Sequence, residues 1–393
     1  MSDANRIQLR YCEEDTWGTT PATRELQELR LTGESLSYNI ANIVSTEIRD
    51  DRQVTDLIQT GAECGGGTNF ELSYGTYDDF MEGALWSDWS ADLAISEADD
   101  MASTATGFST AGTANFDNIS AGQWIKVGGF TANSSENNGY YLVTSVSATA
   151  GTLTTSPVPA SVEAAAASKT ITINGSMLRN GTTEHSYSIE RYFADLSPSV
   201  YNAFTGMVVN QVNHSLAANS IVTGGFEFLG KAATAEATAM SSGAVTDATT
   251  TDVINAVANV ANFLENNTAV TACLVQSLDF TLLNNVRGHS SVGQLGFCDI
   301  GVGQVDVTGT LNAYFRNKDL YDKYVAGTET SISFRVADTA GNAYIYTFHR
   351  VAFESDPGGQ ATGANTDIME NIGWRAIRDT TYDCTIQIDK FAA

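Results

Sequence analysis

The chain has 393 residues, of which 42% are hydrophobic and 17% charged, and its formal net charge is −26. This composition supports packed cores rather than disorder, and it lacks the basic surface that a reader of duplex DNA needs. No apolar run is long enough for a membrane span, so we expect no membrane insertion by this chain.

Short runs of Val, Ile, Thr, Tyr and Phe alternate with small polar residues and end at Gly, Asn or Asp clusters, which predicts a mainly β fold. One helix is predicted over residues 77–86, because its apolar residues have helical spacing and Asp78 and Asp79 lie in its first turn. The predicted strands include, in chain order, residues 29–40, 123–127, 140–146, 169–173, 332–336 and 344–348.

The sequence contains an internal repeat. Residues 35–40 resemble residues 277–282, and residues 74–82 resemble residues 314–322, in the same order and at nearly the same spacing. The next match, between residues 188–195 and 331–338, has a much shorter spacing, so the first copy carries an extra segment. We therefore predict three domains: residues 1–95 together with 185–235, an inserted β-rich domain at 96–184, and residues 236–393.

Each copy also has a long connection that contains several glycines, at residues 43–68 and 286–304. Loops of this length are usually functional or disordered. A mobile surface loop is one interpretation; recurrence in both copies favours an arm that orders against a neighbouring subunit and is unordered in the free monomer. The candidate contact residues in the arms are Ile43, Ile48, Val54, Leu57, Ile58, Val286, Val292, Leu295 and Phe297.

Known catalytic and metal-binding motifs are not found, and we expect neither an enzyme nor a cofactor. Cys12, Cys64, Cys273, Cys298 and Cys384 are scattered without C-x-x-C spacing, which predicts free thiols. The acids at 13–15 are interpreted as a solvated charge run rather than a cation site. The triglycine at 65–67 is not followed by Lys-Ser/Thr, so it is interpreted as a flexible joint and not as a phosphate cradle.

Several segments resemble the major tail tube proteins of long-tailed, siphovirus-type bacteriophages. The resemblance is carried by residues 9–21, 29–36, 47–54 and 70–79, and by the glycine-flanked strand at 224–230. It covers about the first quarter of the chain well, and the repeat extends it toward the C-terminus. The inserted segment departs from the minimal tube domain and looks like an external decoration.

The resemblance implies two tandem β-sandwich domains, each with a flanking helix and a long β-hairpin arm. Single-domain members are expected to form hexameric rings, so a duplicated chain would form the same ring from three copies, and stacked rings would form the hollow tube for DNA delivery. The implied partners are other copies of this chain, a tape-measure protein, and tail terminator and tail tip proteins. The implied location is the virion tail, after assembly in the cytoplasm of the bacterial host; residues 1–6 also lack the apolar core of a signal peptide.

An acidic channel wall would let double-stranded DNA pass without specific binding, because it repels phosphates. The alternative is that the acids only solubilise the outer surface. Other classes remain open: a single-ring distal tail or adaptor protein, a glycan-binding module formed by the insertion, and, least supported, a glycan-cleaving enzyme. The candidate lumen-facing acids are Glu47, Asp50, Asp51, Glu71, Asp299 and Asp306.

Overall fold

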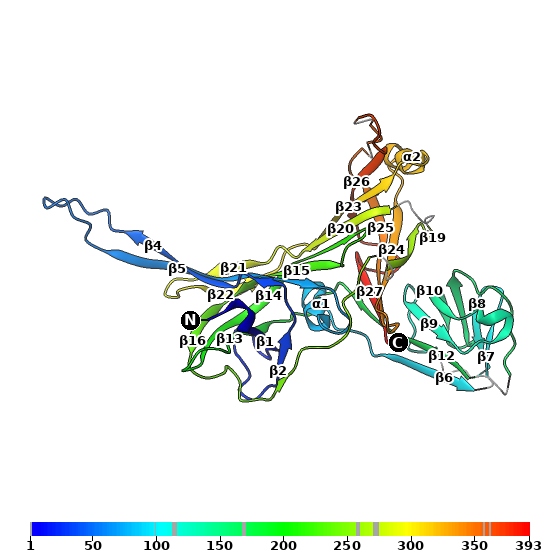
Figure 1. The fold of residues 1–393 in the computed structure, drawn as a ribbon, viewed down its shortest axis with the longest axis horizontal. Helices are drawn as coiled ribbons and strands as arrows, with labels where there is room; N and C mark the ends of the chain where they lie inside the picture. Colours follow the sequence, from blue (N-terminus) through cyan, green and yellow to red (C-terminus); the bar gives the residue numbers. More distant parts are fainter. Residues whose placement is uncertain are drawn as a thin grey trace.

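The computed structural model describes residues 2–98, 100–111, 116–166, 170–256, 260–269, 275–356, 358–360 and 363–393. The fold is mainly β, as predicted (Figure 1). Short 3-10 helices lie at Ala4–Arg6 and Ala132–Ser135. None of the helices among these described residues is long and apolar enough to cross a membrane.

The first half of the chain forms a mainly antiparallel sheet around a large hydrophobic core. Its strands are β1 (Ile7–Glu13), β2 (Leu26–Leu29), β3 (Gly33–Glu34), β4 (Ser37–Val44), β5 (Leu57–Glu71), β13 (Tyr187–Phe193), β14 (Val200–Ala217), β15 (Thr223–Gly230), β16 (Ala232–Glu236) and β17 (Val245–Thr246). The second half adds β18 (Val260–Glu265), β19 (Thr268–Ala269), β20 (Val275–Leu283), β21 (Arg287–Ser290), β22 (Phe297–Gly301), β23 (Asp306–Tyr314), β24 (Thr330–Ala337), β25 (Ala343–Phe353), β26 (Met369–Ala376) and β27 (Gln387–Phe391).

The two halves have the same strand-pairing order. In the first half the order is β1–β13–β14–β15–β5–β4, and in the second it is β18–β24–β25–β26–β23–β20. In both halves a further strand, β16 or β27, pairs with the long third strand. A helix follows β5 and β23 alike: α1 (Asp78–Leu85) in the first half and α2 (Asp319–Ala326) in the second.

One strand joins the halves into a continuous sheet. The second part of β14 pairs with β15 along one edge and with β20 along the other, over Gln211–Ala217 and Ser277–Leu283. The hydrophobic core continues across this seam, because Phe226 of the first half and Phe280 of the second belong to one buried cluster. The chain therefore already contains one junction between a first half and a second half.

The inserted segment has a sheet and a hydrophobic cluster of its own, drawn from residues between Leu93 and Ile173. Its strands pair in the order β6–β12–β9–β10–β11–β8–β7. Figure 1 shows it beside the second half, at the end of the molecule opposite the first arm. The strands are β6 (Leu93–Ala98), β7 (Met101–Ser103), β8 (Gly107–Thr110), β9 (Trp124–Gly128), β10 (Gly139–Ser147), β11 (Thr152–Ser156) and β12 (Thr170–Arg179).

The insertion is docked on the second half through a buried aromatic and polar contact. Trp124 packs in a cluster with Ile345 and Phe391, its Nε1 donates to Thr347 Oγ1 at 2.9 Å, and its backbone N–H donates to Asp389 Oδ1 at 3.1 Å. Complete burial raises the pKa of Asp389 to about 8, because the charged carboxylate is poorly solvated there. The C-terminal strand β27 also pairs with the end of β12.

The triglycine is not a flexible joint, contrary to the sequence interpretation. Gly65, Gly66 and Gly67 lie inside β5 and pair with Leu229, Phe228 and Glu227 of β15. Gly66 has a φ of +127°, and a β-carbon there would lie 2.3 Å from the carbonyl oxygen of Ser35. Glycine is needed because three backbone segments approach closely at this point.

Candidate assembly surfaces

The first arm is the hairpin formed by β4, β5 and the loop at residues 45–56 between them. Figure 1 shows it projecting far from the body of the molecule. Its apolar side chains are exposed, although a row of apolar residues on paired strands is normally buried. Ile43 and Ile58 face each other across the hairpin, and their side chains are 59% and 52% exposed. Exposed apolar surface of this kind is often found at sites of protein–protein contact. The exposed apolar residues of the first arm are Ile40, Ile43, Val44, Ile48, Val54, Leu57 and Ile58.

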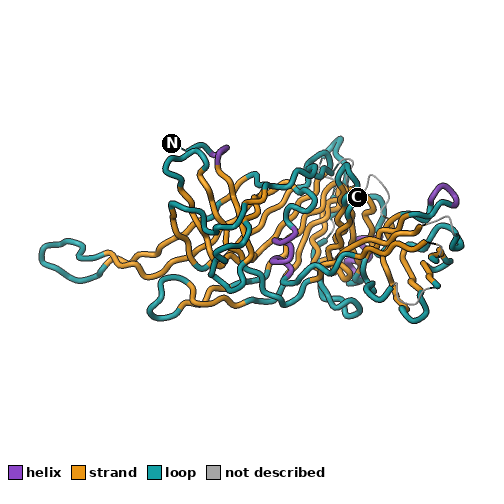
Figure 2. The backbone as a smooth tube through the Cα atoms, turned by 90° about the horizontal axis from the view of Figure 1, so that it is seen from below, coloured by secondary structure: helices purple, strands orange, loops and turns teal. Residues whose placement is uncertain are grey.

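The second arm, formed by β21, β22 and the turn between them, lies against the first half. Figure 2 shows both arms at the same end of the molecule, with the second much shorter. Val292 and Leu295 are exposed, whereas Val286 and Phe297 are half-buried. The base of the arm is fixed to the first half by a hydrogen bond of 2.8 Å from the backbone N–H of Val286 to Asn210 Oδ1.

The predicted lumen acids fall into two groups. Glu47, Asp50 and Asp51 lie together, exposed, in the loop at the tip of the first arm. Asp51 is paired with Arg49 at 2.9 Å, and this pair lowers the pKa of the Asp51 carboxyl.

The other three acids lie nearer the body of the molecule. Glu71 ends β5 and is half-buried; Asp299 is exposed on β22, with an oxygen 3.7 Å from His289 Nδ1. Asp306 begins β23 and forms an ion pair with Arg375, which also contacts Glu354 at 2.5 Å. The two carboxylates raise the pKa of Arg375 and hold its guanidinium charged.

The two helices differ sharply in burial, a difference that the sequence did not reveal. α1 buries Phe80 completely, with ring centroids 4.5 Å from Tyr11 and 4.9 Å from Tyr187. α2 has no buried residue. Its apolar residues have helical spacing, a pattern that is typical of a helix packed against a core. We call the exposed residues around it the helix patch: Tyr314, Phe315, Tyr321, Val325 and Ile368.

α1 is covered partly by the second half of the same chain. Asn284 Nδ2 donates to the carbonyl oxygen of Ala84 at 2.9 Å, and Lys390 Nζ lies 3.3 Å from Asp78 Oδ2. The hydroxyl of Tyr344 donates to the other oxygen of Asp78. In the part of the chain that the structure describes, no segment covers the helix patch in this way.

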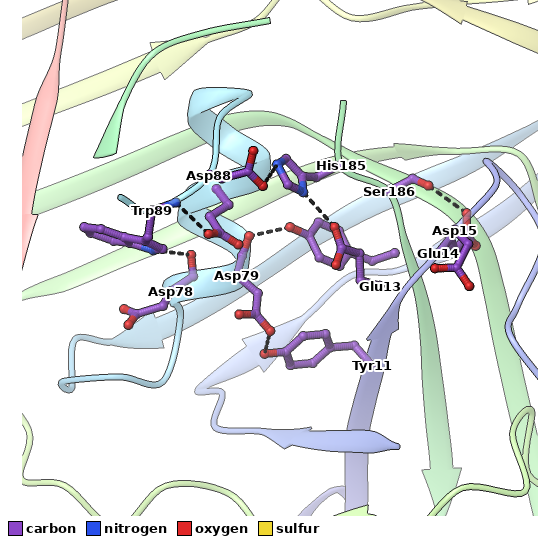
Figure 3. A network of polar contacts seen from close by, with 12 residues as sticks. Tyr11, Glu13, Glu14, Asp15, Asp78, Asp79, Asp88, Trp89, His185 and Ser186 are labelled. Carbon is purple, nitrogen blue, oxygen red and sulfur yellow. Dashed lines mark hydrogen bonds and ion pairs between the residues drawn. The ribbon is translucent and has the colours of Figure 1, made fainter. Parts of the chain in front are cut away.

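A network of acids fixes α1 to β1 and β13 (Figure 3). Tyr11 Oη donates to Asp79 Oδ2 at 3.0 Å, and burial of this pair raises the pKa of both groups. His185 Nδ1 lies 2.7 Å from Glu13 Oε1, and this hydrogen bond raises the pKa of His185. These hydrogen bonds tie α1, β1 and the segment before β13 together, and most buried polar groups in folded proteins are paired in this way.

Glu14 corrects the interpretation of residues 13–15 as a solvated charge run. Its side chain is buried and accepts hydrogen bonds from Ser186 Oγ at 2.9 Å, Ser188 Oγ at 2.6 Å, and the backbone N–H groups of Gly18 at 2.6 Å and Gly206 at 2.8 Å. It is a structural carboxylate that ties the N-terminal segment to the sheet. No sequence signal distinguishes it from its neighbours Glu13 and Asp15.

In the described part of the chain, the first arm also has an unpaired strand edge, that of β4. β20 is paired on both edges, by β14 and β23. Within the described ranges, β4, which occupies the same place in the first half, is paired only by β5. A long unpaired strand edge beside exposed apolar side chains is a template for pairing with another chain.

These features define a β-protein with an exposed apolar arm and, within the described ranges, a strand edge of β4 that is not paired. A comparison with protein-family models matches residues 4–376 to the phage tail tube protein family. The chain therefore belongs to the phage tail tube protein family, whose members are structural components of the virion tail. A search of curated proteins found no significant match. The free thiols predicted by the sequence are Cys12, Cys64, Cys298 and Cys384, whereas Cys273 lies outside the described residues.

Proposed function

We propose that this protein is the major tail tube subunit of a siphovirus-type phage and that it arose by tandem duplication of a tube domain. Each chain then supplies two tube domains, residues 1–95 with 185–235 and residues 236–393, and carries a decoration domain at residues 96–184. Three copies form a pseudo-hexameric ring. The single observation that carries this proposal is the common strand-pairing order of the two halves, joined at the β14–β20 seam.

The ring follows from repetition of that seam. Within the chain, β20 of the second half joins β14 of the first half. If β4 of each copy joins the second half of the next copy in the same manner, the sheet closes on itself and its open edges disappear. Stacking of such rings through heterologous contacts produces a filament.

The tube delivers phage DNA through its channel during genome ejection. With a net charge of −26, the chain can present an acidic wall that repels phosphates instead of binding them. A subset of Glu47, Asp50, Asp51, Glu71, Asp299 and Asp306 faces the channel in this proposal. The tube assembles in the host cytoplasm around a tape-measure protein, between terminator and tip proteins.

Electron microscopy of the purified, untagged protein over a concentration series tests this function. We expect hollow tubes or stacked rings whose end views show threefold or pseudo-sixfold symmetry. Single rings that never stack, at any concentration, would instead identify a distal tail or adaptor protein.

A further inference from the structure

A polar groove of about 430 Å³ lies in the second half of the chain, at the junction of β23 and β26. Its lining includes Gln304, Val305, Asp306, Arg375, Ile377 and Arg378. The groove thus carries two arginines on a chain whose net charge is −26. Ile377 and Val305 are apolar members of its lining.

The strand ladders show what occupies the same place in the first half. The β5–β15 ladder ends at the pair Cys64 and Gly230, and the β23–β26 ladder ends at the pair Val307 and Ala376. Lys231 therefore corresponds to Ile377. Both donate a backbone N–H at 2.9 Å to the neighbouring strand, Lys231 to the carbonyl of Thr205 and Ile377 to that of Arg350.

Ala62 corresponds to Val305 by the same comparison, because each lies two residues before the end of its ladder. In the first half this place is covered by the second arm. Gly296, in the turn of that arm, is buried, and a β-carbon there would lie 3.3 Å from the carbonyl oxygen of Lys231 and 3.7 Å from that of Ala62. The second arm thus rests on the surface whose counterpart in the second half is the groove.

We propose that the groove is the seat of the first arm of a neighbouring copy of this chain. The inference rests on the proposed ring, and it names the surface that receives the arm. Within one chain the second arm rests on the first half; between chains the first arm rests on the second half. The same arm-on-sheet contact is then made six times in a ring of three copies.

The charges of the two surfaces are complementary in part. The tip of the first arm carries Glu47, Asp50 and Asp51 in exposed positions, together with Arg52 and with Arg49, which is paired with Asp51. The groove carries Arg375 and Arg378 together with Asp306. Both arginines already form ion pairs with partly exposed carboxylates: Arg375 with Glu354 and Asp306, and Arg378 with Asp383. Exposed pairs of this kind hold their partners weakly, and a guanidinium has five N–H donors to share.

Apolar contact supports the same arrangement. Ile48 and Val54 flank the acids at the tip and are among the most exposed apolar side chains of the molecule. Ile377 and Val305 lie half-buried in the groove. In this arrangement the acids at the arm tip lie in a contact between copies, and Glu71 and Asp299 remain as the candidates for the channel wall.

Site-specific cross-linking in assembled protein tests the seat. Two full-length variants are mixed, one with Gln53→Cys at the arm tip and one with Ile377→Cys in the groove, both in a background with Cys273→Ser and Cys298→Ser. A short bismaleimide can then join the two positions only between chains. A matched pair replaces Gln53→Cys by Ser147→Cys, on an exposed strand end of the inserted domain.

We expect a covalent dimer from the arm–groove pair in assembled samples and none from the matched pair. Normal assembly with no arm–groove product, or with equal products from both pairs, would overturn the seat and leave the ring intact. Failure of the unmodified protein to assemble would instead contradict the proposed function, and the seat with it.

Charge reversal provides a second, independent readout. Arg378→Glu should raise the concentration needed for assembly by about tenfold or more, because like charges then face each other across the contact, and Asp50→Lys in the same chain should restore assembly. Arg6→Glu, an equal charge change on an exposed turn near the N-terminus, is the control. If Arg378→Glu and Arg6→Glu have the same effect, the groove does not receive the arm.

Discussion

The first arm allows a sharp separation between folding and assembly. Ile43 and Ile58 face each other on the arm and are about half exposed in the single chain. Complete burial of such a side chain is worth about 1.5–3 kcal/mol, so removing the remaining half from water contributes about 1 kcal/mol for each. The double substitution Ile43→Ser and Ile58→Ser should therefore weaken each contact between copies by about 2 kcal/mol, or roughly 30-fold in association constant.

The assay compares two measurements on the same variant. In urea, the unfolding free energy of the unassembled chain should change by less than about 0.5 kcal/mol, because the substituted side chains are largely in water before assembly. Sedimentation over a concentration series should show the onset of assembly displaced by roughly 30-fold. Val158→Ser with Val162→Ser is a matched control on the inserted domain, where the two valines are 53% and 70% exposed.

Three results would refute this reasoning. An arm variant that assembles at the concentration of the unmodified protein would show that these side chains stay in water in the tube. Equal losses of assembly in the arm variant and the control would show that assembly weakens wherever exposed apolar side chains are removed, and not at the arm in particular. A large loss of unfolding free energy in the arm variant would mean that the arm is part of the folded core.

Three further predictions follow from the fold, the docked insertion and the channel. Phe80→Ala should cost about 3–5 kcal/mol of unfolding free energy, whereas Leu320→Ala on the uncovered helix should cost less than about 1 kcal/mol; similar losses in urea unfolding would contradict the difference in burial. Burial raises the pKa of Asp389 from 3.8 to about 8. The stability that this group contributes is therefore complete below pH 4 and falls as the pH rises to about 8, and Asp389→Asn should flatten this part of the pH profile of the unfolding free energy. An unchanged profile would refute the raised pKa of Asp389. Asp299→Lys should make assembled tubes retain duplex DNA in a salt-sensitive manner, and equal retention by Asp117→Lys on the inserted domain would remove Asp299 from the channel wall.

Local patterns predicted most elements of the fold, because strands and helices have short-range signatures. The helix at residues 77–86 is found as α1 (Asp78–Leu85), and the strands at 332–336 and 344–348 lie within β24 and β25. The two predicted connections contain hairpins, but much of the first is the extended strand β5, so the loop itself is only residues 45–56. The glycines at 65–67 predicted a flexible joint, but in the structure they allow neighbouring backbone segments to approach closely.

Long-range contacts account for what the sequence could not show. α1 and α2 have similar patterns, but α1 packs on aromatic residues of its own half, such as Tyr11 and Tyr187, and is also contacted by the second half, whereas α2 has no buried residue. Glu14 is buried and accepts hydrogen bonds from the nearby Gly18 and from three donors in distant parts of the chain, Ser186, Ser188 and Gly206. The groove likewise needs residues brought together from β23, β26 and the segment after β26. Such features depend on tertiary packing, which overrides local propensity.

The most direct test of the account is a cryo-electron microscopy reconstruction of tubes assembled from the full-length protein. We expect three chains in each ring, six repeated tube domains around a hollow channel, and β4 of each copy paired with the second half of its neighbour. Rings of six chains, or a ring in which β4 remains unpaired, would contradict the claim that the junction within the chain is repeated between chains.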